Sequence, residues 1–325
     1  MKKIVFTVMF LCAVMAAFAG GKSDSAAGGV NNWPSKTIQV YIPWGTGGDT
    51  DLHGRVLSEL VAKELGATIV CANMPGTSGT VAARHVMDSP NDGYTILWSQ
   101  TTFLIASMLG ISEFDYTNFE TAATVIEDSS NFLVVNKKIG KFKSIQEFAD
   151  YGKAHPGEIV DGIEVGSDAH LYSLLVSDQL GIKVNRVDVG GTATKIPALI
   201  SGNIDCAAGV YGTYKPYIDS GDFQVLVTFS PERINGLEDV PTMKEITGKD
   251  FGLSKMFGYW FPKGTDPAIV AKFAEAARRA VNSSEFKAHC EKYFITPIAR
   301  TGNEAKTYLD DQYKIMNNYK AEMFN

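Results

Sequence analysis

Residues 37–65 read TIQVYIPWGTGGDTDLHGRVLSELVAKEL, and this stretch decides the fold class of the 325-residue chain. Its first part, TIQVYI, is rich in β-branched residues, which predicts a strand. Its second half repeats apolar side chains about one helical turn apart, at Leu52, Val56 and Leu60, which predicts an amphipathic helix. The loop between them, PWGTGGDTD at 43–51, holds three glycines. A strand that leads through a glycine-rich loop into a helix is typical of α/β folds.

The same alternation of strand and helix continues along the chain. Further strands are predicted at residues 67–72, 94–98, 132–135, 184–189, 204–208, 223–229 and 257–261. Helices are predicted at residues 80–87, 144–154, 169–180 and 194–200, and three more helical patterns follow the last strand. This alternation favours parallel sheets covered by helices on both faces.

The alternation falls into two blocks, which predict two α/β lobes. Lobe I is predicted at residues 33–130 plus 235–325, and lobe II at residues 131–234. A first lobe built from both ends of the chain requires two crossings between the lobes. Two crossings make a hinge, and the cleft beside a hinge is a common place for a small ligand.

The N-terminal region predicts export. Residues 1–19 have a basic start, an uncharged apolar run and a small-residue ending, the pattern of a signal peptide cleaved near Ala19. Residues 20–32 are rich in Gly, Ser and Ala, which predicts a flexible tether. We therefore expect a periplasmic protein.

Composition and motifs exclude several classes of function. With 30 basic and 36 acidic residues and a formal net charge of −6, the chain lacks the basic surplus of a nucleic-acid binder. The five histidines are scattered, and neither H-E-x-x-H nor C-x-x-C occurs. No local pair of residues marks an acid/base or nucleophile–base couple. We therefore predict a protein that is not an enzyme and has no metal or cofactor.

Four glycine-rich turns follow predicted strands and indicate one ligand site. They lie at residues 43–51, 73–79, 165–170 and 190–192, two in each block. Glycines let backbone N–H groups face a ligand, and the helix behind adds a partial positive charge, so the first loop suits a carboxylate. A dinucleotide site is disfavoured because this loop lacks the third glycine of G-x-G-x-x-G. A plain turn without a ligand is the alternative interpretation.

At this point the chain resembles the substrate-binding receptors of tripartite tricarboxylate transporters, also called the Bug family of periplasmic solute receptors. The resemblance rests on motifs that run in family order over nearly the whole chain: WPSK at 33–36, PWGTGGDTD at 43–51, NMPGTSGT at 73–80, PNDGYTIL at 90–97, GSDAHL at 166–171, VDVGG at 187–191, ALISGNID at 198–205, VPTMKEI at 240–246 and FGYWFPKGT at 257–265.

The resemblance implies a two-lobed Venus-flytrap fold of the type II periplasmic binding proteins. A carboxylate-bearing ligand would lie between the first loop and the 166–171 loop, and the receptor, expected to be a monomer, would deliver it to a permease with a large and a small membrane subunit. The ligand-binding residues predicted by position are Thr46, Gly47, Gly48 and Asp51 in the first loop, Ser167 and His170 in the opposing loop, Ser78 and Thr101 at the mouth, and Gly191 in the fourth turn.

Two acids depart from the family pattern. Asp49 and Asp168 stand where small neutral or hydroxyl residues are common, and we include both among the predicted ligand-binding residues. Three interpretations are open: the acids cap their helices and face solvent, they bind the ammonium of an amino-acid-like ligand, or they take part in binding a metal-chelated carboxylate.

The predicted function is therefore an exported receptor for a small organic acid or an amino-acid-like ligand. One alternative is a receptor that presents its ligand to a membrane sensor kinase. A second alternative is an exported enzyme that uses the same cleft.

Overall fold

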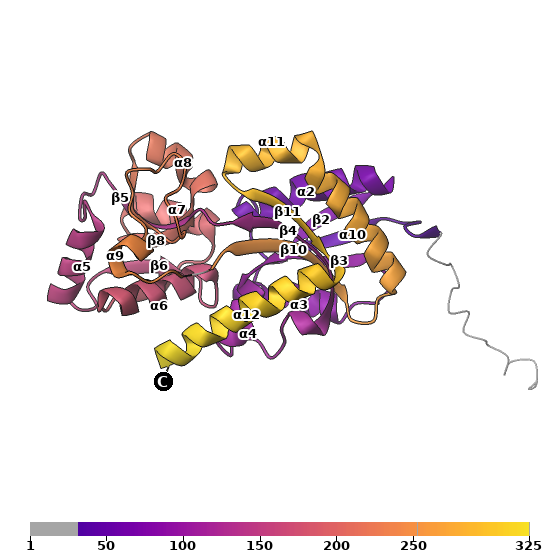
Figure 1. Cartoon of the computed structure of the whole chain (residues 1–325), viewed down its shortest axis with the longest axis horizontal. Coiled ribbons are helices and arrows are strands. Elements are labelled where there is room, and N and C mark those ends of the chain that lie inside the picture. The colour runs from indigo at the N-terminus through magenta and orange to yellow at the C-terminus, as the bar shows by residue number, and fades with distance from the viewer. Residues whose placement is uncertain (1–31, 252, 325) are drawn as a thin grey trace, which may run out of the picture. The chain divides into compact units, whose positions relative to one another are not determined.

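The computed structural model describes residues 32–251 and 253–324 (Figure 1). The predicted signal peptide at 1–19, and the predicted tether up to residue 31, lie outside the described residues. Two β-sheets with helices packed against them build the described chain, which confirms the two-lobed α/β prediction. Within this part of the chain, no helix is both long enough and apolar enough to cross a membrane.

The first sheet has six strands in the order β11-β4-β10-β3-β1-β2. Its strands are β1 (Ile38–Ile42), β2 (Ile69–Asn73), β3 (Thr95–Gln100), β4 (Phe119–Asp128), β10 (Lys255–Pro262) and β11 (Thr296–Thr301). β1 pairs in parallel with β2 and β3, but β10 runs antiparallel to β3 and β4, and β11 runs antiparallel to β4.

The second sheet has five strands in the order β7-β6-β8-β5-β9. Its strands are β5 (Asn131–Asn136), β6 (Val160–Ile163), β7 (Asn185–Asp188), β8 (Cys206–Val210) and β9 (Phe223–Thr228). β6 pairs in parallel with β7 and β8, whereas β5 is antiparallel to β8 and β9. Both sheets are therefore mixed. The prediction of parallel sheets holds for the pairs that β1 and β6 make and is wrong for the pairs that β4, β5 and β10 make, because strand direction depends on which strands become neighbours.

Helices connect and cover the strands of both sheets. Around the first sheet lie α2 (Asp49–Leu65), η2 (Thr77–Gly79), α3 (Thr80–Met87), α4 (Thr102–Met108), η3 (Tyr116–Asn118), α10 (Pro267–Asn282), α11 (Ser284–Tyr293) and α12 (Gly302–Phe324). Between the strands of the second sheet lie α5 (Ile145–Ala154), α6 (Asp168–Leu180), α7 (Thr192–Ser201) and α8 (Tyr211–Asp219), and α9 (Met243–Thr247) lies in the connection from β9 to β10.

The chain passes between the sheets twice. It leaves β4 of the first sheet for β5 of the second, and it returns from β9 to β10. Strands from both ends of the chain consequently lie side by side in the first sheet, as the indigo and orange-to-yellow ribbons of Figure 1 show.

The returning strand β10 carries a charge into the interior. All of its residues are buried, and most are large apolar side chains such as Trp260 and Phe261. Its first residue, Lys255, is only 6% exposed. A buried lysine is rare unless it is paired, so acids are expected beside Lys255.

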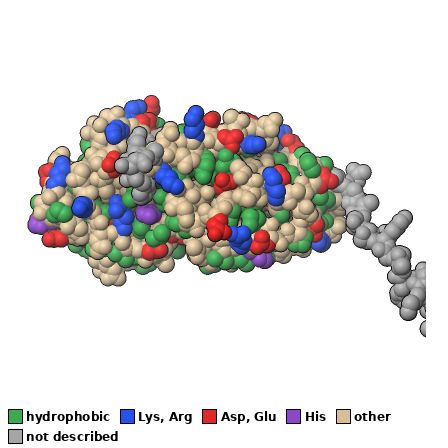
Figure 2. Space-filling model, turned by 90° about the horizontal axis from the view of Figure 1, so that it is seen from below, with side chains coloured by type: hydrophobic (Ala, Val, Ile, Leu, Met, Phe, Trp, Pro, Cys, Tyr) green, Lys and Arg blue, Asp and Glu red, His purple; other side chains and the backbone are tan. Residues whose placement is uncertain are grey.

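Surface charges behave differently. Positive and negative side chains are interspersed over the face shown in Figure 2. Exposed pairs such as Lys215–Asp219 at 2.7 Å and Arg279–Glu64 at 2.6 Å join neighbouring helical positions or neighbouring helices. Such pairs contribute about 0–1 kcal/mol each to the stability of the fold.

Candidate functional site

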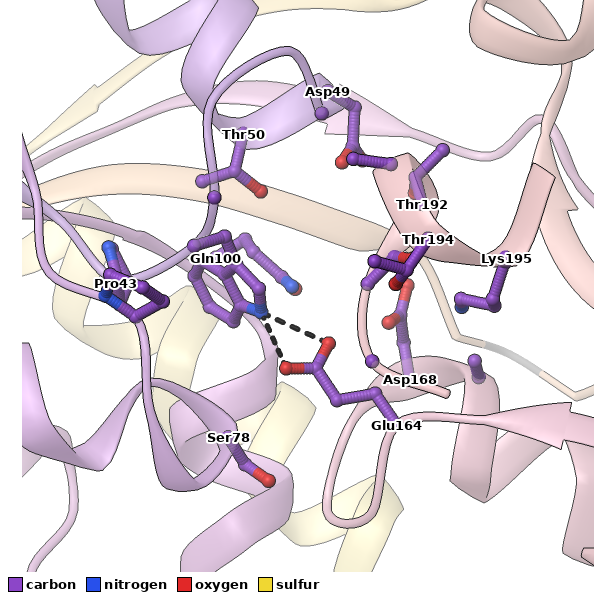
Figure 3. Close-up of a pocket in the computed structure, with 18 of the residues that line it drawn as sticks. Pro43, Asp49, Thr50, Ser78, Gln100, Glu164, Asp168, Thr192, Thr194 and Lys195 are labelled. Atoms are coloured by element: carbon purple, nitrogen blue, oxygen red, sulfur yellow. Dashed lines mark hydrogen bonds between the residues drawn. The ribbon is translucent and has the colours of Figure 1, made fainter. Parts of the chain in front are cut away.

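A cavity of about 740 Å³ lies between loops of the two sheets. This volume is within the range of small-molecule sites, about 300–1,000 Å³. The first residues of three helices line it: Asp49 of α2, Asp168 of α6 and Thr192 of α7 (Figure 3). The three helices follow β1, β6 and β7, so the cavity lies where open α/β sheets commonly bind ligands, beyond the carboxyl ends of their strands.

Five of the eleven predicted ligand-binding residues line this cavity: Gly48, Asp49, Ser78, Asp168 and Gly191. They come from all four predicted glycine-rich turns, and the structure brings these turns to one place. The other six do not line the cavity: Thr46, Gly47, Asp51, Thr101, Ser167 and His170.

The Asp51 carboxylate is fully engaged in hydrogen bonds with its neighbours in and around the first loop. Its carboxylate accepts hydrogen bonds from the Gly47 N–H at 3.0 Å, from Arg55 Nε at 2.8 Å and from Asn73 Nδ2 at 2.8 Å. Thr46 is exposed, and its hydroxyl donates to Asn73 Oδ1 at 3.3 Å. Asp51 therefore holds the loop in shape and occupies one of the N–H groups that the sequence suggested for a ligand.

The predicted residues of the opposing loop and of the mouth also make hydrogen bonds within the protein. Ser167 is the N-cap of α6, and its hydroxyl accepts from the His170 N–H at 3.4 Å. His170 Nδ1 accepts from the Gly166 N–H at 3.1 Å. Thr101 is buried, and its hydroxyl accepts from the Met256 N–H at 2.8 Å. These residues position the walls of the cavity, and a direct contact between any of them and a ligand stays a prediction.

The two unusual acids share a cation that sequence reasoning missed. Lys255 Nζ lies 2.6 Å from Asp49 Oδ2 and 3.3 Å from Asp168 Oδ2. The interpretation that these acids cap their helices and face solvent is wrong, because Gly48 and Ser167 occupy the cap positions and Asp49 is only 5% exposed. Lys255 thus connects the N-terminal ends of α2 and α6.

The pKa values of the pair follow from this geometry. Burial alone would raise the pKa of Asp49, but the charge and hydrogen bond of Lys255 bring it below its ordinary value. Burial alone would lower the pKa of Lys255, but Asp168 and Asp49 raise it above its ordinary value. Both groups are therefore charged at neutral pH.

A third carboxyl group faces the same lysine. Asp128 is the register partner of Lys255 across β4 and β10, and it accepts hydrogen bonds from the N–H and the hydroxyl of Ser130 at 2.8 and 2.6 Å. Complete burial raises the pKa of Asp128 to about 6. One lysine therefore stands among three acids.

The same cluster bears on metal binding. Among residues 32–251 and 253–324, no group of three or more His, Cys, Asp or Glu is arranged to hold a metal ion. The position of a cation between Asp49 and Asp168 is taken by the ammonium group of Lys255. These residues suit a nitrogen cation, and we assign no cofactor or metal to them.

A second buried lysine, Lys195 on α7, was also missed. It is 5% exposed and lines the cavity, and within the described chain no hydrogen bond or ion pair reaches its ammonium group. Burial lowers its pKa, while Asp168 and Glu164 act in the opposite direction. A signal was present in the sequence, because Lys195 falls on the same buried face of α7 as Ile196 and Leu199.

Contacts also cross the cleft. Trp44, in the loop after β1, donates its indole N–H to both carboxylate oxygens of Glu164, after β6, at 3.0 Å (Figure 3). Ser78 donates its hydroxyl to the carbonyl oxygen of Val165. Burial raises the pKa of Glu164, although Lys195 and the Trp44 hydrogen bond partly offset this.

Comparison with known proteins adds independent information. Protein BugT of Bordetella pertussis is 28% identical over 306 residues, which cover 93% of this chain and 94% of BugT. The solved structure of the periplasmic binding protein BugD has a TM-score of 0.81 at 24% identity and covers 90% of this chain and 98% of BugD. MatC from Rhodopseudomonas palustris with bound malate has a TM-score of 0.78 at 24% identity, with 88% and 99% covered. The structural likenesses establish a shared periplasmic binding protein fold.

The family follows from the sequence match. A family model described as "Tripartite tricarboxylate transporter family receptor" matches residues 54–319, most of the described chain. The chain belongs to the receptor family of the tripartite tricarboxylate transporters.

Proposed function

We propose that this protein is an extracytoplasmic solute receptor that binds a small carboxylate-bearing metabolite in the cavity between its two sheets. It would deliver this ligand to a secondary permease with a large and a small membrane subunit. The observation that carries the proposal is the cavity of about 740 Å³, whose wall includes the N-terminal end of α7, which has no acid in its first turn, and the buried residue Lys195. Helix N-termini and buried ammonium groups both favour anions.

Family membership supports the transport role. Receptors of this family serve tripartite tricarboxylate transporters, and MatC, which shares the fold, has malate bound. No nucleophile–base pair is among the described residues that line the cavity; the hydroxyl of Ser78, for example, donates to a backbone carbonyl.

We further propose that the two lobes, residues 33–130 plus 235–325 and residues 131–234, close on the ligand. The two connections between the sheets supply the hinge. Contacts across the cleft, such as Trp44 with Glu164, favour the closed form, and a ligand adds to this only by its greater affinity for that form. The permease would then recognise the closed receptor.

Export and a monomeric state complete the proposal. The signal-peptide pattern at residues 1–19 supports delivery to the periplasm, where a solute receptor meets its ligand. The partners would be the ligand and the two permease subunits.

The test is a search for the ligand in the mature protein, residues 20–325. Native mass spectrometry should detect a small carboxylate that co-purifies, and thermal-shift assays with malate, succinate, citrate and L-glutamate should find at least one that raises Tm. A protein that carries no carboxylate and responds to no carboxylate would contradict the proposed function. Turnover of a bound compound would instead support the enzyme alternative.

A further inference from the structure

We propose that the ligand carries an amino group as well as a carboxylate, and that the two bind at neighbouring parts of the cavity wall. The carboxylate binds to Lys195 and to the free backbone N–H groups of Thr192 and Ala193 at the start of α7. The amino group binds at the acidic wall formed by Glu164 and Asp168. This inference rests on the proposed function, because it specifies the ligand of that same cavity.

The first observation is the state of Lys195. The residue lines the cavity, and only 5% of it is exposed. No carboxylate of the described chain lies within ion-pair distance of its ammonium group, although Glu164 and Asp168 line the same space (Figure 3). The ammonium group therefore places a positive charge at the cavity wall without a partner in the described chain, and an anionic ligand at this position would supply the counter-charge.

The second observation is a difference between the three helix N-termini. The first turn of α2 contains Asp49 and Asp51, and the first turn of α6 contains Asp168. The first turn of α7 contains no acid, and its N-cap is Gly191. Within the described chain no hydrogen bond uses the N–H groups of Thr192 and Ala193, which both line the cavity.

This difference places the anion site. At α2 and α6, acids of the chain itself already interact with the partial positive charge of the helix. At α7 that charge is free, and Lys195 adds a full positive charge beside it. The carboxylate is therefore expected at α7, away from the first glycine-rich loop.

The third observation is the charge on the acids that line the cavity. Lys255 cannot serve the ligand's carboxylate, because it is already 2.6 Å from Asp49 and 3.3 Å from Asp168. Apart from the exposed Asp188, three acids line the cavity, Asp49, Glu164 and Asp168, against Lys195 and Lys255.

This excess of acid favours a positively charged second group on the ligand. Once a carboxylate has bound Lys195, the wall of Asp49, Glu164 and Asp168 retains only Lys255 as a counter-charge. A second carboxylate would meet like charge in a poorly solvated space, whereas an ammonium group would be attracted. An amino-acid-like zwitterion satisfies both walls at once.

The experiment compares ligands that differ in one amino group. Isothermal titration calorimetry on the mature protein would use the pairs L-glutamate and glutarate, L-norvaline and valerate, and L-tyrosine and 3-(4-hydroxyphenyl)propionate. The amine-bearing member of the responding pair should bind at least about 10-fold more tightly, as one charge-assisted hydrogen bond provides. Any ligand that co-purifies should contain both a carboxylate and a basic nitrogen.

Two variants with matched controls test the two walls separately. Lys195→Met should weaken binding at least about 10-fold, and Lys195→Arg should restore part of it. Its control is Lys183→Met, which removes an exposed lysine from the loop between α6 and β7 and should leave ligand affinity unchanged. Asp168→Asn should reduce the preference for the amine about 10-fold, whereas Asp178→Asn, at an exposed position of the same helix, should not. Unfolding curves of each variant would show that it is folded.

The outcomes separate this inference from the proposed function. Equal or tighter binding of the amine-free acids, or a co-purifying acid without a basic nitrogen, would overturn the inference and leave the receptor function standing. Unchanged affinity in Lys195→Met would overturn the assignment of the carboxylate to α7. If no carboxylate of either kind binds or co-purifies, the proposed function fails as well.

Discussion

Two buried lysines line the same cavity, and they differ in what surrounds them. Lys255, at the start of β10, has Asp49 and Asp168 as ion-pair partners and Asp128 as its neighbour across the sheet. Lys195, on α7, is equally buried and has no such partner in the described chain. A charge that the protein neutralises by itself contributes to its stability, whereas a charge left unpaired at a cavity wall is available to a ligand.

The largest expected effect is a difference in the free energy of unfolding between variants of the two lysines. Lys255→Met leaves two carboxylates without their counter-charge and should lower the free energy of unfolding by about 3–5 kcal/mol, the usual cost of breaking a buried pair from one side. Lys195→Met removes a buried charge that has no partner, so it should change the stability of the ligand-free protein by less than about 1 kcal/mol or raise it.

Urea unfolding followed by circular dichroism measures both values. Equal losses of stability in the two variants would mean that Lys195 is paired in the ligand-free protein, and the contrast between the lysines would disappear.

The second prediction concerns the acid that Lys255 does not neutralise. The folded pKa of Asp128, about 6, lies above its ordinary value of 3.8, so between these pH values the folded protein holds a proton that the unfolded chain has released. This group therefore stabilises the protein as pH falls from about 7 to about 4.5, and it opposes folding above pH 6.

Asp128→Asn keeps an oxygen acceptor for the Ser130 hydrogen bonds and removes the titration. Relative to the wild type, the variant should gain about 2 kcal/mol of stability between pH 4.5 and pH 7.5, out of about 3 kcal/mol for the whole shift of roughly two pKa units. Denaturation curves at several pH values test this. Parallel pH profiles for the two proteins would show that Asp128 titrates normally.

The third prediction addresses closure of the cleft. Trp44→Phe removes the indole N–H that bonds Glu164 across the cleft, so the open form should gain population and ligand affinity should fall about 10-fold. Small-angle scattering should give a larger radius of gyration for ligand-free Trp44→Phe than for the ligand-saturated wild type. Glu164→Gln is a control for the scattering measurement alone, because its amide oxygen still accepts from Trp44 while the charge of the acidic wall is lost. Identical scattering curves for all states would speak against a hinge.

The smallest expected effect compares two glycines of the first loop. Gly47 has a φ of +89° and does not line the cavity, so Gly47→Ala should cost about 1 kcal/mol of stability and leave affinity unchanged. Gly48 lines the cavity, and a Cβ there would meet only the Gly45 carbonyl oxygen at 3.9 Å. Gly48→Ala should therefore fold normally and weaken binding less than Lys195→Met does. A larger loss in Gly48→Ala would place the carboxylate at the first loop.

Much of the fold could be predicted because most elements have a clear local pattern. The bounds of β1, α3 and α5 agree with the sequence to within one residue. β4 was missed because FETAATVIED mixes polar and apolar residues, and α8 was missed because Gly212 and Pro216 interrupt its helical pattern. Strand direction was wrong for the antiparallel strands, since pairing partners far apart in the chain determine it.

The site was less accessible to sequence reasoning for a similar reason. The glycine-rich turns are local signals, and all four contribute to the cavity. The roles of Lys255 and Lys195 depend on their neighbours in space, which the sequence does not show. Asp49, for example, is 206 positions away from Lys255 along the chain. Two acids at helix N-termini consequently looked unpaired in the sequence, although one lysine serves both.

A crystal structure of the mature protein with its co-purifying ligand would test the central contrast most directly. We predict that a carboxylate oxygen of the ligand lies within hydrogen-bond distance of Lys195 Nζ and of the Thr192 N–H, while Lys255 keeps its contacts with Asp49 and Asp168. A carboxylate bound at the Gly48 loop, with Lys195 still unpaired, would contradict the assignment.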